Sequence, residues 1–118
     1  FTLTKNRLTE KGSLMMNVAS TSSTGPLTVL IKNTLAKVFP YTYELTSKDS
    51  YNTLLFGFMH EPDFTQLSAN LPTDLTSLAT SARDGLHRVT FDPAKKVATD
   101  NTSPVEVLTE KMLLSEVP

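Results

Sequence analysis

Apolar residues recur at helical spacing in the stretch PLTVLIKNTLAKVF, which predicts an amphipathic helix. The apolar positions follow the spacing i, i+3, i+4, i+8 and i+11, and they are Leu27, Leu30, Ile31, Leu35 and Val38. Lys32, Asn33 and Lys37 fall outside this stripe and are expected to face solvent. Pro26 suits the first helical position because its missing N–H group would be unpaired there, and Pro40 ends the helix.

Three shorter runs have the composition of β-strands. SLMMNVAS, residues 13–20, is apolar between Gly12 and a Ser/Thr-rich loop, which predicts a buried, interior strand. YTYEL, residues 41–45, is aromatic and β-branched, and YNTLLFGFM, residues 51–59, is the most apolar stretch of the chain. The turn residues TSKDS join the last two runs, so we expect an antiparallel hairpin whose second strand is central.

Shorter helices are predicted toward both ends of the chain. A first helix ends near Gly12, and Asp63 begins a helical patch with Phe64, Leu67 and Leu71 on one side. DLTSLATSARDGL predicts a further helix that ends near Gly85, and HRVTFDPAKKVATD is expected to be extended or looped. The phrase SPVE predicts a capping box at the start of a last helix.

The order of these elements predicts an α/β fold. Strand, helix, strand and strand form half of an α/β sheet, and a mostly helical tail follows. We therefore expect residues 1–60 to form the α/β half-sheet and residues 61–118 to form a tail that packs on the same domain.

Composition removes several classes of function. The net charge of -1 gives no electrostatic basis for binding nucleic acid or an anionic membrane. The chain has no cysteine, which excludes disulfides and thiol nucleophiles, and His60 and His87 lack ligand-like spacing, so no metal site is expected. With no long apolar run and no signal-like N-terminus, the chain is expected to be soluble and cytoplasmic.

Three places could carry chemistry, and each also has an ordinary structural interpretation. The loop ASTSSTG precedes Pro26 and could bind an anion at a helix N-terminus, although its residues Thr24 and Gly25 also suit a helix cap. His60 and Glu61 could act as a base and its orienting partner, or could be solvated loop residues. Asp49, Ser50 and Tyr51 lie in the predicted hairpin turn, where such residues commonly bond local backbone.

Three stretches together resemble one family. NRLTEKGSLMMNVAS resembles the approach to the fifth strand of methyltransferase-fold transferases. LIKNTLAKVFPYTYELTSKDSYNTLLFGF resembles the following helix, sixth strand and Tyr-led seventh strand of the spermidine synthase-like group. TDNTSPVEVL resembles the tail phrase "TDD-x-x-PVE-x-L" of bacterial spermidine synthase-like proteins. Together these stretches run over nearly the entire chain.

The resemblance implies that the chain is the C-terminal part of a spermidine synthase-like protein. Its fold would be the C-terminal half of a Rossmann-like methyltransferase sheet, a strand–helix–strand–strand unit with an antiparallel final hairpin and a helical tail. The family transfers an aminopropyl group from decarboxylated S-adenosylmethionine to putrescine, and an Asp accepts the proton of the attacking amine. The family's Gly-rich loop, ribose-binding acid and catalytic aspartates come earlier than this segment, so the segment alone is expected to be inactive and to bind no cofactor.

The resemblance also implies three substrate-binding residues. Tyr51 falls where the family's polyamine-pocket Tyr precedes the final strand, and Asn17 falls where spermidine synthases usually carry Gln. Asp100 matches the first Asp of the tail phrase and is not explained by the helix cap that follows it. The parent protein would thus take a small-molecule amine and a nucleoside substrate.

One departure from the family pattern keeps other functions open. Val18 and Ala19 stand where the enzymes usually have Gly-Glu, and a polyamine pocket needs carboxylates and amide oxygens to hold ammonium groups. A homologue with a different activity on the same fold, or a non-catalytic interaction domain, remains an alternative. Because the chain begins at Phe1 on what resembles the end of a helix, we also expect a fragment in which the strand at residues 14–19 is an apolar edge, so that the chain forms homo-oligomers.

Overall fold

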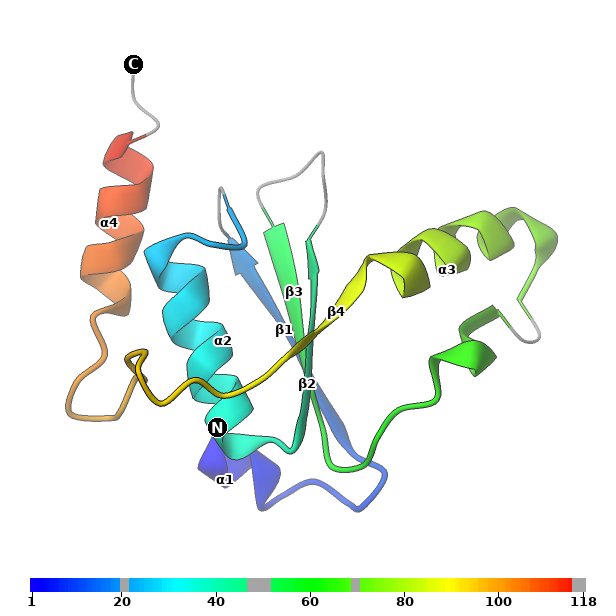
Figure 1. The fold of residues 1–118 in the computed structure, drawn as a ribbon, viewed down its shortest axis with the longest axis horizontal. Coiled ribbons are helices and arrows are strands. Elements are labelled where there is room, and N and C mark those ends of the chain that lie inside the picture. The colour runs from blue at the N-terminus through cyan, green and yellow to red at the C-terminus, as the bar shows by residue number, and fades with distance from the viewer. Residues whose placement is uncertain (20–21, 47–51, 69–70, 116–118) are drawn as a thin grey trace.

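The computed structural model describes residues 1–19, 22–46, 52–68 and 71–115, and its fold is mixed α/β (Figure 1). In chain order the elements are α1 (Thr2–Lys5), β1 (Ser13–Ala19), α2 (Pro26–Val38), β2 (Tyr41–Thr46), β3 (Asn52–Phe58), the 3-10 helix η1 (Phe64–Ser68), α3 (Thr73–Gly85), β4 (Leu86–Val89) and α4 (Val105–Ser115). The strands form one four-stranded sheet in the order β1-β3-β2-β4. Helices α2 and α4 lie on one side of it, and η1 and α3 lie on the other.

Every neighbouring pair of strands in the sheet is antiparallel. Because β1 and β2 both pair with β3, they run in the same direction, and β3 is reversed between them. The predicted antiparallel hairpin and the central position of β3 are therefore confirmed.

Strand β1 lies at an edge of the sheet, so the prediction of an interior strand is wrong and the expectation of an edge at residues 14–19 is confirmed. Its residues alternate in burial: Leu14, Met16 and Val18 pack against the core, whereas the residues between them are exposed. Met15, for example, is 65% exposed. The apolar run looked buried in the sequence because methionines stand on both faces of the strand.

The second edge strand comes from the segment that we expected to be extended or looped. Strand β4 pairs antiparallel with β2, from Leu86 opposite Leu45 to Val89 opposite Thr42. A four-residue strand is too short to show a clear alternation in the sequence. The sheet thus includes residues from beyond position 60, and the division of the chain at that position stays a prediction.

The core lies between α2 and the sheet. Leu27, Leu30 and Leu35 on α2 are buried as the helical spacing predicts, and Leu55 on β3 is fully buried opposite them. Pro26 occupies the predicted position at the start of the helix. Burying this apolar surface is the main contribution that holds the helix on the sheet.

Gly57 allows Phe39, the residue after α2, to pack into this core at the C-terminal end of the helix. A Cβ atom at Gly57 would lie only 2.6 Å from Cγ of the Phe39 ring, and Phe39 is itself 2% exposed. The ring can therefore approach the backbone of β3 this closely only because position 57 has no side chain.

Asn33 is 3% exposed, so the prediction that it faces solvent is wrong. Its side-chain amide donates to three backbone carbonyl oxygens, those of Asp92, Lys95 and Lys96, at 3.1, 3.1 and 3.2 Å. Its Oδ1 accepts from the N–H of Asp92 at 2.9 Å. Residues 92–98, which we call the strap, thus cover this side of α2, and sequence periodicity cannot show cover that comes from so far along the chain.

The opposite face of the sheet is aromatic. Phe64 of η1 packs edge-on against Tyr43 of β2 and Phe58 of β3, with ring centroids 4.9 and 6.0 Å apart. Asp63 holds the start of η1 as predicted, because its Oδ1 accepts from the N–H and the hydroxyl of Thr65 at 3.0 and 2.6 Å. One short helix thereby covers part of this face.

Candidate functional site

The strand directions bring the C-terminal ends of two strands and the N-terminus of one helix together at one end of the sheet. Strands β1 and β2 run the same way, and α2 connects them, so the carboxyl ends of both strands lie beside the N-terminus of α2 (Figure 1). In open sheets of mostly parallel strands, ligands usually bind outside the carboxyl ends of the strands, and β1 and β2 share their direction here although β3 lies antiparallel between them. We call this region the carboxyl edge and treat it as the candidate site.

An ion pair ties the carboxyl edge together. Lys32 Nζ on α2 lies 2.9 Å from Glu44 Oε2 and 3.1 Å from Glu44 Oε1 on β2, and it also donates to the carbonyl oxygen of Ser23 at 3.0 Å. The two charged side chains are only 17% and 16% exposed, so this pair is less screened by water than a surface pair. It fixes the loop before α2 relative to β2.

The loop before α2 is held by its own hydroxyl groups. The hydroxyls of Ser22 and Thr24 lie 2.8 Å apart, Ser22 Oγ accepts from the N–H of Thr24 at 3.1 Å, and Thr28 Oγ1 donates to the carbonyl of Ser22 at 3.1 Å. Gly25 is the N-cap residue, without a side-chain hydrogen bond. These bonds hold residues 22–25 against the first turn of α2, and the anion-binding interpretation of the loop stays a prediction.

Asn17 lies near the carboxyl edge but on the face of the sheet opposite α2. It is exposed on β1, opposite Leu54 of β3, and its neighbours Met16 and Val18 point toward α2. Its amide oxygen is accessible to a ligand that approaches from that face. Tyr51, the second predicted residue, lies outside the described residues.

Asp100 lies at the other end of α2. It is exposed in the turn closed by two hydrogen bonds between Thr99 and Thr102, both 3.0 Å long. It lines a polar hollow of about 540 Å³ together with Lys5 and Lys37, near the C-terminus of α2. Since a helix of 13 residues is about 20 Å long, the structure does not bring Asp100 and Asn17 together.

The His60 and Glu61 pair is open to solvent. Glu61 Oε1 instead accepts from Arg88 Nη1 of β4 at 3.4 Å, and the Arg88 guanidinium lies 5.2 Å from the centre of the Tyr41 ring. His60 is exposed beside it. The contacts of Glu61 therefore favour a surface ion pair rather than a partner for a histidine base.

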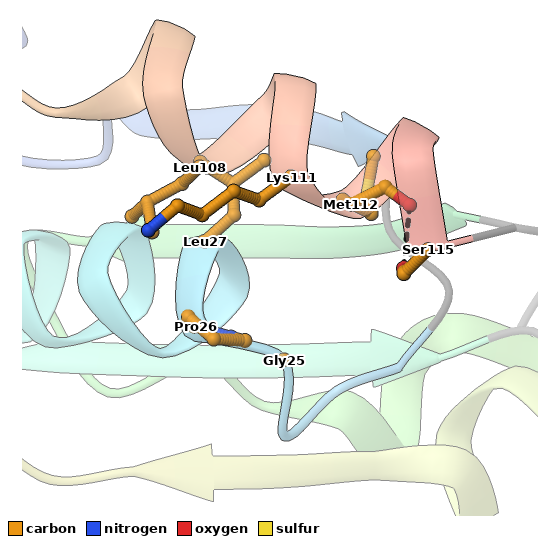
Figure 2. Close-up of a pocket in the computed structure, with 7 residues that line it drawn as sticks. All are labelled: Gly25, Pro26, Leu27, Leu108, Lys111, Met112 and Ser115. Carbon is orange, nitrogen blue, oxygen red and sulfur yellow. Dashed lines mark hydrogen bonds between the residues drawn. The ribbon is translucent and has the colours of Figure 1, made fainter.

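A small cavity of about 210 Å³ separates the first turn of α2 from α4. Figure 2 shows Leu27 of α2 facing Leu108 of α4, with the Lys111 side chain passing over them and Ser115 donating to the carbonyl of Met112. Among the described residues that line it, Lys111 alone is titratable. The described lining can accept a small apolar group, and within it Lys111 has no acidic partner for catalysis.

Residues 1–19, 22–46, 52–68 and 71–115 contain no cluster of three His, Asp or Glu side chains placed to hold a metal ion. In the same part of the chain, no helix has the length and apolarity needed to cross a membrane. No protein-family model, curated protein or solved structure matches the chain.

The Lys32–Glu44 pair is the feature of the carboxyl edge that the sequence did not indicate. We expected Lys32 on the solvent-facing side of α2, whereas its side chain pairs with Glu44 in the following strand, β2. One signal was present: Glu44 is an acidic residue inside an otherwise apolar and hydroxyl-bearing strand, and a charge at such a position usually has a partner.

Proposed function

We propose that this chain is the C-terminal part of a spermidine synthase-like transferase. The parent protein would transfer an aminopropyl group from decarboxylated S-adenosylmethionine to a polyamine acceptor, and the segment alone would be inactive. One observation supports this beyond the sequence resemblance: β1 and β2 run in parallel through the α2 crossover, and β3 returns antiparallel in the final hairpin. That is the strand–helix–strand–strand unit that the resemblance implies.

The carboxyl edge is the more suitable place for an amine. The amide oxygen of Asn17 can accept a hydrogen bond from an ammonium group, and the charge of Lys32 is already balanced by Glu44. The hollow at Asp100 contains Lys5 and Lys37, whose charges would repel a polyamine. Of the two candidates that the structure describes, we therefore assign the amine to Asn17 and not to Asp100.

The coding sequence upstream of Phe1 provides the first test. We expect it to encode a Gly-rich strand–loop–helix and an Asp-rich loop, as a nucleoside site of this family requires. The longer protein should then bind 5′-methylthioadenosine in isothermal calorimetry. If the longer protein is folded but shows no binding heat at millimolar nucleoside, the proposal is wrong.

Substitutions in that longer protein test the place of the amine. Asn17→Ala should raise the KM for the acceptor amine and leave nucleoside binding unchanged, whereas Asp100→Ala should change neither. An increase in KM with Asp100→Ala alone would reverse the assignment.

The alternative is a non-catalytic interaction domain, and one observation favours it. The face of the sheet opposite α2 has an apolar hollow of about 530 Å³, lined by Met15, Phe56, Phe58, Phe64 and Leu67 among others. Exposed apolar surface of this kind often marks a contact with another protein. The absence of nucleoside motifs upstream of Phe1 would favour this second function.

A further inference from the structure

The two edges of the sheet differ in how well they resist the addition of another strand. The β4 edge has only four residues and includes Arg88, and a charged side chain on an edge opposes strand pairing. The β1 edge has seven residues, SLMMNVA, with no charged residue, no proline and no glycine. The β1 edge therefore lacks the features that usually protect an edge.

Within the described part of the chain, β1 pairs with β3 and with no other strand. Its outward N–H and C=O groups can therefore accept a further strand by ordinary ladder hydrogen bonds. Such a strand needs no charged or specially shaped side chain to fit beside β1.

The sequence of β1 is complementary to itself in the antiparallel direction. A two-fold axis at Met16 would place Leu14 of one copy opposite Val18 of the other on the α2 face. On the other face it would place Met15 opposite Asn17, and no like charges would meet. The pairing keeps every core-facing residue on the core side of both copies.

The apolar hollow continues to this edge. Ser13 and Met15 of β1 line it, and Met15 is 65% exposed. A strand added at β1 would cover part of the Met15 side chain as well as the free backbone groups. Burial of that apolar surface would add to the ladder hydrogen bonds.

We infer that the 118-residue chain forms a two-fold dimer in which β1 pairs antiparallel with β1 of a second copy, centred on Met16. The two four-stranded sheets become one continuous sheet, and both α2 helices lie on the same side of it. Because two short strands bury less than a standard interface, the dimer should form at micromolar rather than nanomolar concentrations. This inference does not depend on the proposed function, so the two can fail separately.

Charge substitutions at the paired positions test the dimer and its register. In sedimentation equilibrium from micromolar concentrations to about 1 mM, the unaltered chain should show a monomer–dimer equilibrium. The double variants M15K/N17K and M15E/N17E should each be monomeric, because like charges then face each other twice across the axis. Mixing the two should restore dimers that contain one copy of each.

Leu78→Lys is the matched control, because Leu78 on α3 is also 65% exposed but lies away from β1. It should leave the dimer unchanged, and circular dichroism should show that all variants fold. An unaltered chain that stays monomeric at about 1 mM overturns the inference. So do charged variants that still dimerise alone, folded mixtures that form no mixed dimer, or a dimer lost with Leu78→Lys.

Discussion

The two faces of the sheet are made by alternate residues of the same strands, yet their side chains are buried to very different degrees. On the face covered by α2, Leu55 is 0% exposed and Phe39 is 2% exposed. On the other face, Leu54 and Phe56 of β3 are only half-buried, and Phe56 lines a hollow of about 530 Å³.

This difference follows from the elements that cover each face. Helix α2 has 13 residues and is held on its outer side by α4 and the strap. The other face depends on the five-residue η1 and on α3, which extends away from the sheet and leaves Leu78 exposed (Figure 1). The strands therefore carry more apolar surface than the described helices cover, and the uncovered surface lies on the face opposite α2.

The largest loss of stability is expected from truncating one of two neighbouring leucines that point to opposite faces of the sheet. Leu55→Ala should lower the free energy of unfolding by about 3 kcal/mol, because it removes buried contacts and leaves a cavity under α2. Leu54→Ala should cost only about 1 kcal/mol, because its surroundings are already partly open to water. Urea denaturation of both variants measures the difference. Equal losses would show that the opposite face is packed as tightly as the α2 face.

The strap should matter nearly as much to the α2 face. Asn33→Ala removes the partner of three carbonyl groups and one N–H group and should cost about 2 kcal/mol. Hydrogen exchange should accelerate at the amide of Asp92, which donates to Asn33.

Thr34→Val is the companion variant, because Thr34 Oγ1 accepts from the amide of Ala98 at 2.8 Å. It should accelerate exchange at Ala98 while Asp92 stays protected. If Asn33→Ala leaves both the unfolding free energy and the exchange of Asp92 unchanged, the strap does not hold α2.

A smaller loss is expected from added volume on the tightly packed face. Gly57→Ala places a methyl group 2.6 Å from the Phe39 ring, so the ring must shift, at a cost of about 1.5 kcal/mol. A double-mutant cycle checks the cause: with Phe39→Leu in place, the added Gly57→Ala should cost much less. Strictly additive losses would mean that the strain arises from the backbone of β3 rather than from Phe39.

The elements that sequence could predict are those whose pattern is local. The apolar spacing of α2, the aromatic and β-branched β2 and the apolar β3 each contain their own signal, and the capping role of Asp63 needs only the residues after it. The strand β4 and the burial of Asn33 depend on partners elsewhere in the chain, which periodicity does not contain. The candidate site divides in the same way. A resemblance can name Asn17 and Asp100, but only the fold shows that Asn17 lies on β1 near the carboxyl edge and Asp100 lies near the C-terminus of α2.

The smallest effect concerns Asp63, which anchors the cover of the more open face. Hydrogen bonds from the hydroxyl and the N–H of Thr65 hold the pKa of the Asp63 carboxyl below its usual range. A carboxyl group whose pKa is lowered in the folded state stabilises the protein at pH values above its unfolded-state pKa of about 4. That contribution is lost as the pH falls through the folded pKa. The thermal midpoint of Asp63→Asn should therefore lie slightly below that of the unaltered chain near pH 6, and the gap should shrink below about pH 4.

Thr65→Val removes the hydroxyl donor, so carboxyl NMR titration should show the pKa of Asp63 moving up toward its ordinary value. An Asp63 titration that is the same with and without the Thr65 hydroxyl would mean that this bond does not hold η1 against the aromatic face.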